Sequence, residues 1–199
     1  MEVGTAPPVV GTSPIARHLP GDKDVWVFIV AELLMFGVFF AIYIVNRFFE
    51  VEMFNASQLS LNRNLGVANT FFLVTSSWAV ASSVRAARRS RRAEVSLYLG
   101  VAIGLSFAFM LVKYVEYSAK FNAGIAMTTN TFYMFYFCLT TIHLLHVIGG
   151  TIILIVMWMK AKEGVYHARN TKGLETGASY WHMVDLLWVF LFPLLYPLR

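Results

Sequence analysis

Residues 140–150 read Thr-Thr-Ile-His-Leu-Leu-His-Val-Ile-Gly-Gly and lie inside an apolar run from Phe132 to Met159. The run is long enough for a transmembrane helix, which needs about 20 apolar residues. Its two histidines, His143 and His146, are three residues apart and therefore share one side of that helix. Ionisable side chains at membrane depth are costly, so both histidines are candidate functional residues.

The composition places the chain in the membrane. Of its 199 residues, 58% are hydrophobic and 14% are charged, and the mean hydropathy is +0.62. Soluble chains carry about 25% charged residues. The single cysteine, Cys138, excludes a disulfide within the chain and a metal site built from cysteines.

Five apolar runs predict an all-α, polytopic membrane protein with five transmembrane helices. We expect two parts, a cytoplasmic N-terminal tail at 1–24 and a membrane domain at 25–199. The tail is not expected to be a signal peptide, because it has no basic segment followed by an apolar stretch. The five predicted spans are 25–49, 66–87, 95–117, 131–159 and 178–197.

The basic residues predict the orientation. Eleven of the sixteen lysines and arginines lie in the N-terminal tail and around the second and fourth loops. The positive-inside rule therefore predicts a cytoplasmic N-terminus and an external C-terminus. Five of the eleven form an arginine run, which is either a topology signal or a site for anionic lipid headgroups. These are Arg85, Arg88, Arg89, Arg91 and Arg92.

Five ionisable side chains are expected within the bilayer. Glu32 lies eight residues past Asp24, about 12 Å into the membrane from the cytoplasmic side. His182 and Asp185 share a face in the first turns of the fifth span. With His143 and His146 they could form one polar seam between the first, fourth and fifth spans. In this seam, Glu32 or Asp185 would accept a hydrogen bond from a histidine.

Three interpretations of this seam remain open. The groups could fix helix register through satisfied polar contacts. They could bind a metal or haem, although bundles with carboxylate–histidine metal sites use Glu-x-x-His on two helices, and neither His143 nor His146 has a carboxylate three residues before it. They could handle protons, because apolar surroundings disfavour an ionised Glu32 and would let it exchange a proton with the cytoplasm.

Small residues predict where helices approach one another closely. The pairs Gly100 and Gly104, four residues apart, and Gly149 and Gly150 are expected at helix contacts. Residues 75–83 of the second span are rich in serine and alanine, and we expect them to make hydrogen bonds between helices.

The end of the third span carries Lys113, Glu116 and Tyr117. Lys113 and Glu116 can pair along the helix because they are three residues apart. Tyrosine is enriched where helices leave the membrane. We therefore expect this segment at the outer membrane interface, anchored at the headgroups.

Several motifs together resemble subunit III of the haem–copper oxidases. The stretch Trp181-His182-Met183-Val184-Asp185-Leu186-Leu187-Trp188-Val189-Phe190-Leu191 is similar to one signature of that family. Residues 140–150 and the segment 31–40 are similar to two others, and Asn69-Thr70 and Glu116-Tyr117 also fit. The resemblance extends from about Pro20 to Tyr196. It implies that Glu32 is the family's carbodiimide-reactive carboxyl.

This resemblance implies a non-catalytic accessory subunit of a respiratory terminal reductase in a bacterial inner membrane. It implies no haem, copper or other metal on this chain. Haem, with copper or iron, would be on the partner catalytic subunit. The accessory subunit would support assembly, bind phospholipid and assist proton supply. Nothing in the resemblance implies nucleic acid as a partner.

The span count distinguishes branches of the family. Mitochondrial-type members have seven spans, and this chain would correspond to the last five. Lys113-x-x-Glu116-Tyr117 and Asn130-Thr131-Phe132 are most similar to the NorE-type proteins associated with nitric oxide reductase. The lipid-holding cleft of seven-span members is in doubt here. The alternatives are subunit III of a cytochrome c or quinol oxidase and, from another class, a free-standing proton or metal transporter.

Overall fold

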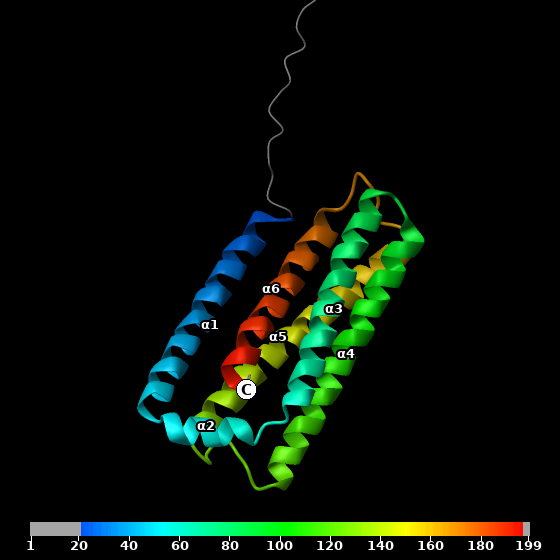
Figure 1. Ribbon diagram of the computed structural model, residues 1–199. Helices are drawn as coiled ribbons and strands as arrows, with labels where there is room; N and C mark the ends of the chain where they lie inside the picture. The colour runs from blue at the N-terminus through cyan, green and yellow to red at the C-terminus, as the bar shows by residue number, and fades with distance from the viewer. Residues whose placement is uncertain (1–20, 197–199) are drawn as a thin grey trace, which may run out of the picture.

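The computed structural model describes residues 21–196, in which the chain forms six helices and no strand longer than an isolated bridge (Figure 1). All but α2 are long and apolar enough to cross a membrane, which confirms the all-α, five-span prediction. Most of the predicted N-terminal tail lies outside the described residues. The helices are α1 (Lys23–Phe49), α2 (Val51–Leu59), α3 (Arg63–Arg88), α4 (Arg92–Asn122), α5 (Thr131–Lys162) and α6 (Lys172–Leu195).

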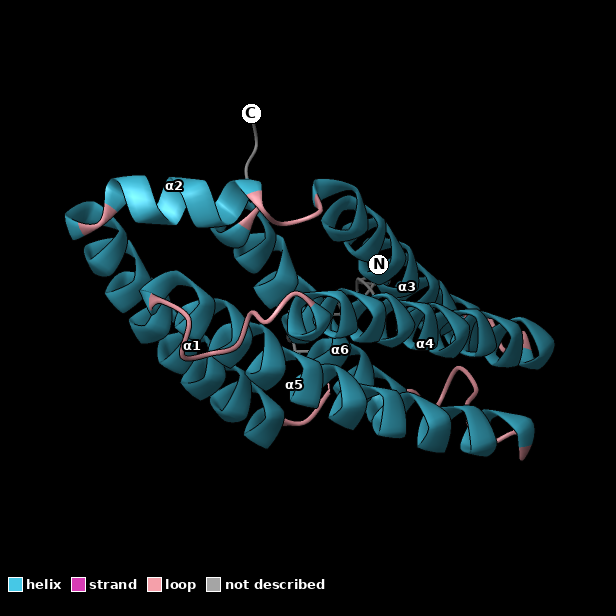
Figure 2. Cartoon of the chain, turned by 90° about the horizontal axis from the view of Figure 1, so that it is seen from below, coloured by secondary structure: helices cyan, strands magenta, loops and turns pink. Residues whose placement is uncertain are grey.

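Helices α3, α4, α5 and α6 form a four-helix bundle in which each helix packs against two neighbours. Helix α1 lies on the outside of this bundle, against α5 and α6, and only 11% of its membrane span is buried. Helix α2 runs from α1 toward α3 across one end of the bundle, as the view from that end shows (Figure 2). The chain is therefore a multi-pass membrane protein with one peripheral span.

The two ends of the bundle differ. At one end, which we call the arginine end, α1, α4 and α6 begin and α3 and α5 finish; the other is the α2 end. At the arginine end the Asp22 carboxylate accepts from the Lys23 N–H, and the Asp22 N–H donates to Thr176 Oγ1. Lys172 lies 3.0 Å from Asp22 and lowers the pKa of its carboxyl through a hydrogen bond and its charge. The start of α1 is thus tied to α6.

The helix bounds differ from the predicted spans where polar residues continue a helix. Helix α4 runs five residues beyond the predicted span, to Asn122, and α6 begins six residues before it, at Lys172. Helix α2 was not predicted, because its nine residues are too few and too polar to produce an apolar run. Hydropathy locates the part of a helix that lies in hydrocarbon, and the hydrogen-bonded helix extends past it.

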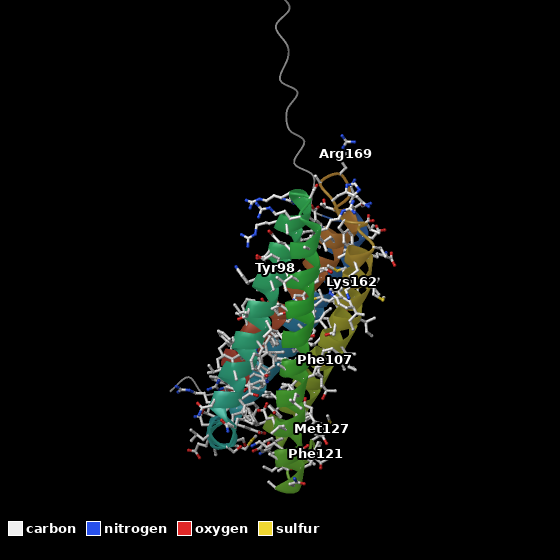
Figure 3. All side chains as sticks on the ribbon, turned by 90° about the vertical axis from the view of Figure 1, so that its right-hand side faces the viewer. Tyr98, Phe107, Phe121, Met127, Lys162 and Arg169 are labelled. Carbon is white, nitrogen blue, oxygen red and sulfur yellow. The ribbon has the colours of Figure 1, made fainter. Side chains whose placement is uncertain are left out.

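The outer faces are apolar. Figure 3 views the α4 side, where Phe107 and Phe121 point outward from the ribbon, and both are more than half exposed. Arg169 lies beyond them at the arginine end. Continuous apolar exposure of this kind suits lipid tails or a membrane partner.

Candidate functional site

Glu32 and His146 meet at the interface between α1 and α5. Glu32 Oε2 lies 3.2 Å from His146 Nε2, and both side chains are about 15% exposed. The distance is that of an ion pair, although the angle is not that of a hydrogen bond. Phe36 packs edge-on against the imidazole, and the Tyr180 hydroxyl donates to the His146 carbonyl. The structure therefore brings together the carboxylate of the first span and one histidine of the fourth.

The other ring nitrogen of His146 constrains the protonation of this pair. His146 Nδ1 lies 2.8 Å from the Ile142 carbonyl oxygen, which can only accept, so Nδ1 carries a hydrogen. A further proton shared with Glu32 then gives either imidazolium facing carboxylate or neutral imidazole facing carboxylic acid. The two arrangements contain the same number of protons. Nε2 is therefore the ring nitrogen that faces the Glu32 carboxylate.

His182 and Asp185 face a different helix. His182 Nδ1 and Ser77 Oγ of α3 are 2.6 Å apart. Asp185 also interacts with the Ser77 hydroxyl, and its Oδ1 is buried without a hydrogen-bond partner among the described residues. Ser77 lies in the serine-rich segment for which hydrogen bonds between helices were predicted, so this part of the prediction is confirmed.

His143 lies in the centre of the bundle. Its side chain is fully buried, with Phe109 edge-on and Trp188 at a ring distance of 5.3 Å. Neither ring nitrogen has a hydrogen-bond partner among residues 21–196. The position suits a neutral imidazole used as a flat packing group.

The predicted single seam is therefore wrong. Glu32 with His146, and His182 with Asp185, occupy separate interfaces, and His143 lies apart from both. An α-helix turns about 100° per residue, so residues three apart differ by about 60° in direction. That difference sends His146 toward α1 and His143 toward the core between α4 and α6.

Lys113 and Glu116 form a buried ion pair, which corrects their predicted place at the outer interface. Lys113 Nζ lies 2.9 Å from Glu116 Oε2, and the side chains are 0% and 2% exposed. The Tyr196 hydroxyl donates to Glu116 Oε1 at 2.5 Å, and the Lys113 ammonium lies over three aromatic rings. Lys113 is nine residues from the end of α4, about 13 Å inside it. The rings belong to Tyr117, Tyr136 and Trp188.

The four predicted packing glycines divide into two groups. A Cβ added to Gly150 would lie 2.7 Å from the Trp181 ring, and one added to Gly149 would touch the Tyr180 hydroxyl. A Cβ on Gly104 would meet nothing within 4 Å, and Gly100 has only Trp158 at 3.6 Å. Close packing is thus found at the pair in α5. Gly104 faces outward from α4 and makes no close helix contact within the described residues, so its predicted packing role stays a prediction.

The arginine run lies where α3 ends and α4 begins. Arg88 pairs with Glu175 of α6 at 3.0 Å, and Arg91 pairs with Glu94. Arg85 donates to the neutral Ser82 hydroxyl. Arg89 lines a small groove between α3 and α4, and Arg92 lies beside Gly164 in the turn after α5. Within the described residues, the run therefore contributes two ion pairs, and the Arg85 guanidinium donates to a hydroxyl group and not to a carboxylate.

No group of three or more metal-binding side chains converges within residues 21–196. His143 and His146 point to different neighbours, so they do not form a ligand pair with each other. The prediction that this chain carries no metal remains a prediction.

Comparison with known proteins identifies the family. A family model described as cytochrome c oxidase subunit III matches residues 21–198. The chain belongs to the cytochrome c oxidase subunit III family. The resemblance inferred from the motifs is thereby confirmed, and the helices described above are those of a subunit III.

Individual relatives agree with this membership. The chain is 30% identical to cytochrome c oxidase subunit 3 of Thermostichus vulcanus, over 86% of this chain and 84% of the relative. It is 29% identical to the Synechocystis protein of the same name, over 86% of this chain and 72% of the relative. It is 28% identical to heme-copper oxidase subunit I+III of Aeropyrum pernix, over 90% of this chain and 23% of that longer protein.

Residues of the motifs that resemble the family contact one another across the bundle. Trp181 packs on Gly150, and Trp188 Nε1 donates to Thr70 Oγ1. The sequence did not reveal Ser77 as the partner of His182, nor Tyr196 as the partner of Glu116. In each pair, the two residues are more than 75 positions apart in sequence. The only sequence signal for either partner was the hydroxyl-rich face of α3, which contains Ser77.

Proposed function

We propose that this chain is the non-catalytic subunit III of a haem–copper terminal oxidase, where it binds the catalytic subunit and supports assembly of the complex. The family match over residues 21–198 carries this proposal. The name of the Aeropyrum pernix relative joins subunits I and III in one chain, which supports subunit I as the partner. The transporter alternative has no support among the relatives described above.

Co-purification tests this function. The affinity-tagged full chain, purified from its native host in mild detergent, should bring with it a haem-bearing large subunit in a fixed ratio. A reduced-minus-oxidised absorption spectrum measures that haem. An unrelated tagged multi-pass protein, prepared identically, provides the control. Recovery of the chain with no more haem than the control would contradict the proposal.

The same purified complex can be used to measure which reaction the partner subunit catalyses. The relatives named above are oxidase subunits, so we propose oxygen as the terminal acceptor. The NorE-type assignment and its link to denitrification stay a prediction from the motifs. Oxygen consumption by the purified complex supports the oxidase assignment, and nitric oxide reduction without oxygen consumption would favour the NorE branch.

We infer that the arginine end faces the cytoplasm, in a bacterial inner membrane. Within the described residues, ten of the sixteen lysines and arginines of the chain lie at that end, and the positive-inside rule assigns such an end to the cytoplasm. In a Cys138→Ser background, a membrane-impermeant maleimide applied to intact spheroplasts should label Gly124→Cys at the α2 end. It should leave Arg169→Cys unlabelled until the membrane is opened. The reverse pattern would invert the orientation.

We propose that the Glu32–His146 pair handles a proton, because a carboxyl and an imidazole lie 3.2 Å apart there, between α1 and α5. A hydrophobic carbodiimide reacts with a protonated carboxyl in apolar surroundings. It should therefore label Glu32, and labelling of the chain should be lost in Glu32→Gln. His146→Gln, which keeps the carboxyl, is the matched variant and should alter the rate without abolishing the reaction. Unchanged labelling in Glu32→Gln would refute this role for Glu32.

Phospholipid is the second partner that we propose. The arginine run lies where α3 ends and α4 begins, so it would be at the level of lipid headgroups, where each basic residue attracts anionic lipid. This attraction would hold the subunit and its partner in a common lipid shell.

A further inference from the structure

Four side chains, one from each helix of the four-helix bundle, form a layer in its core. They are Asn69 of α3, Phe109 of α4, His143 of α5 and Trp188 of α6, and each is 0% exposed. The Phe109 ring centre lies 5.0 Å from that of Trp188 and 5.8 Å from that of His143. Trp188 Nε1 donates to Thr70, the residue after Asn69, so α3 and α6 meet at this level. The layer is therefore enclosed by the helices themselves.

Asn69 reaches this layer through the register of α3 against α4. The Ser76 hydroxyl donates to the Ala102 carbonyl, which fixes one point of that register. The two helices are antiparallel, and seven residues make about two turns. Two turns from this point toward the α2 end, Asn69 of α3 and Phe109 of α4 therefore lie opposite each other.

The polar atoms of the layer have no partner in the described part of the chain. The amide oxygen and nitrogen of Asn69 and both ring nitrogens of His143 are buried without a hydrogen bond to any of residues 21–196. Buried side-chain amides and imidazoles are hydrogen-bonded in the great majority of proteins, because their removal from water is costly. These four atoms therefore require a ligand.

The chemistry of the four atoms identifies the ligand class. An amide offers N–H donors and an acceptor oxygen, and a neutral imidazole offers one donor and one acceptor. A metal cation would satisfy only the acceptors, and an anion would satisfy only the donors. Water does both, and a buried water typically makes about three hydrogen bonds to such groups.

We propose that this layer binds ordered water, hydrogen-bonded to the Asn69 amide and to the His143 imidazole. The Lys113 ammonium lies 5.4 Å from the centre of the Trp188 ring, so the water lies beside the buried Lys113–Glu116 pair. The core of the bundle is thus hydrated next to its only fully buried lysine among residues 21–196. The site is internal to the chain, so the inference does not rest on the proposed function.

X-ray radiolytic footprinting of the purified full chain tests the site. X-ray pulses split bound water into hydroxyl radicals, which modify the side chains next to that water even where bulk solvent does not reach. Phe54 is the internal control, because it is also 0% exposed and packs on the rings of Tyr43 and Phe132. We expect mass spectrometry to show Phe109 modified several-fold faster than Phe54. Equal rates in the parent chain would overturn the site without the need for any variant.

Two substitutions of asparagine by leucine provide a matched pair. Asn69→Leu removes the amide from the layer and should lower the modification rate of Phe109 to that of Phe54. Asn64→Leu changes the same atoms at an exposed position of α3 and should leave the Phe109 rate unchanged. His143→Phe keeps an aromatic ring in the layer and should also lower that rate. A Phe109 rate that Asn69→Leu and His143→Phe leave unchanged would overturn the site.

The unfolding equilibrium in SDS gives a second readout. In a dry layer, Asn69→Leu would remove an unsatisfied polar group and raise the folding equilibrium constant about ten-fold. With water bound, the substitution deprives that water of a partner, so we expect no increase. A ten-fold increase would overturn the proposal.

Discussion

Glu116→Gln should destabilise the folded chain by about 3–5 kcal/mol, because it leaves the Lys113 ammonium buried without a counter-charge. Lys113 is fully buried, so no water can replace the lost carboxylate. Its aromatic neighbours compensate only in part, since a cation–π contact contributes about 0.5–2 kcal/mol. The measurement is the SDS mole fraction at the unfolding midpoint of the purified chain, followed by tryptophan fluorescence.

The same helix supplies a matched control. Arg91 and Glu94 also pair three residues apart, at 3.0 Å, but their side chains are 57% and 42% exposed. An exposed pair contributes at most about 1 kcal/mol, so Glu94→Gln should hardly move the midpoint. Equal effects of Glu94→Gln and Glu116→Gln would mean that burial of the Lys113 pair has no energetic consequence.

A double substitution separates charge from packing. Lys113→Met with Glu116→Leu removes both charges and keeps apolar volume, so it should recover much of the stability lost in Glu116→Gln. Recovery will be incomplete because the Tyr196 hydroxyl loses its acceptor. Adding Tyr196→Phe should restore part of the difference. Such a pattern would show that the Lys113–Glu116 pair holds the end of α6 against α4.

The sequence predicted the five spans because hydropathy and length together define a membrane helix. It misplaced Lys113 and Glu116 because two charges among tyrosines near the end of an apolar run are typical of the membrane interface. The groups that make the burial tolerable are Tyr136 on α5 and Tyr196 after α6. No local pattern indicates that these distant side chains surround Lys113.

The candidate site was predictable to a similar extent. Depth along each helix follows from residue counting, so Glu32 and His146 could be expected at compatible heights, and they do meet. The direction of a side chain around its helix depends on which neighbours pack there. That is why counting alone joined His143, His182 and Asp185 into the same seam. The contacts of α3, through Ser77, decided the actual arrangement.

Gly150→Leu should also lower the stability of the folded chain strongly, because the interface between α5 and α6 has no space for a side chain at this position. Its Cβ alone would lie 2.7 Å from the Trp181 ring, and Trp181 is 1% exposed and cannot move aside without displacing α6. Forcing atoms into a packed interface costs about 1–3 kcal/mol or more. Gly104→Leu is the control, because it adds the same atoms to a glycine that has nothing within 4 Å of its Cβ position. We expect Gly150→Leu to lower the unfolding midpoint in SDS and to shift tryptophan fluorescence, and Gly104→Leu to do neither. If the chain tolerated both substitutions equally, α5 and α6 would not be in close contact at Gly150. The stretch 140–150 would then have no role in packing these two helices together.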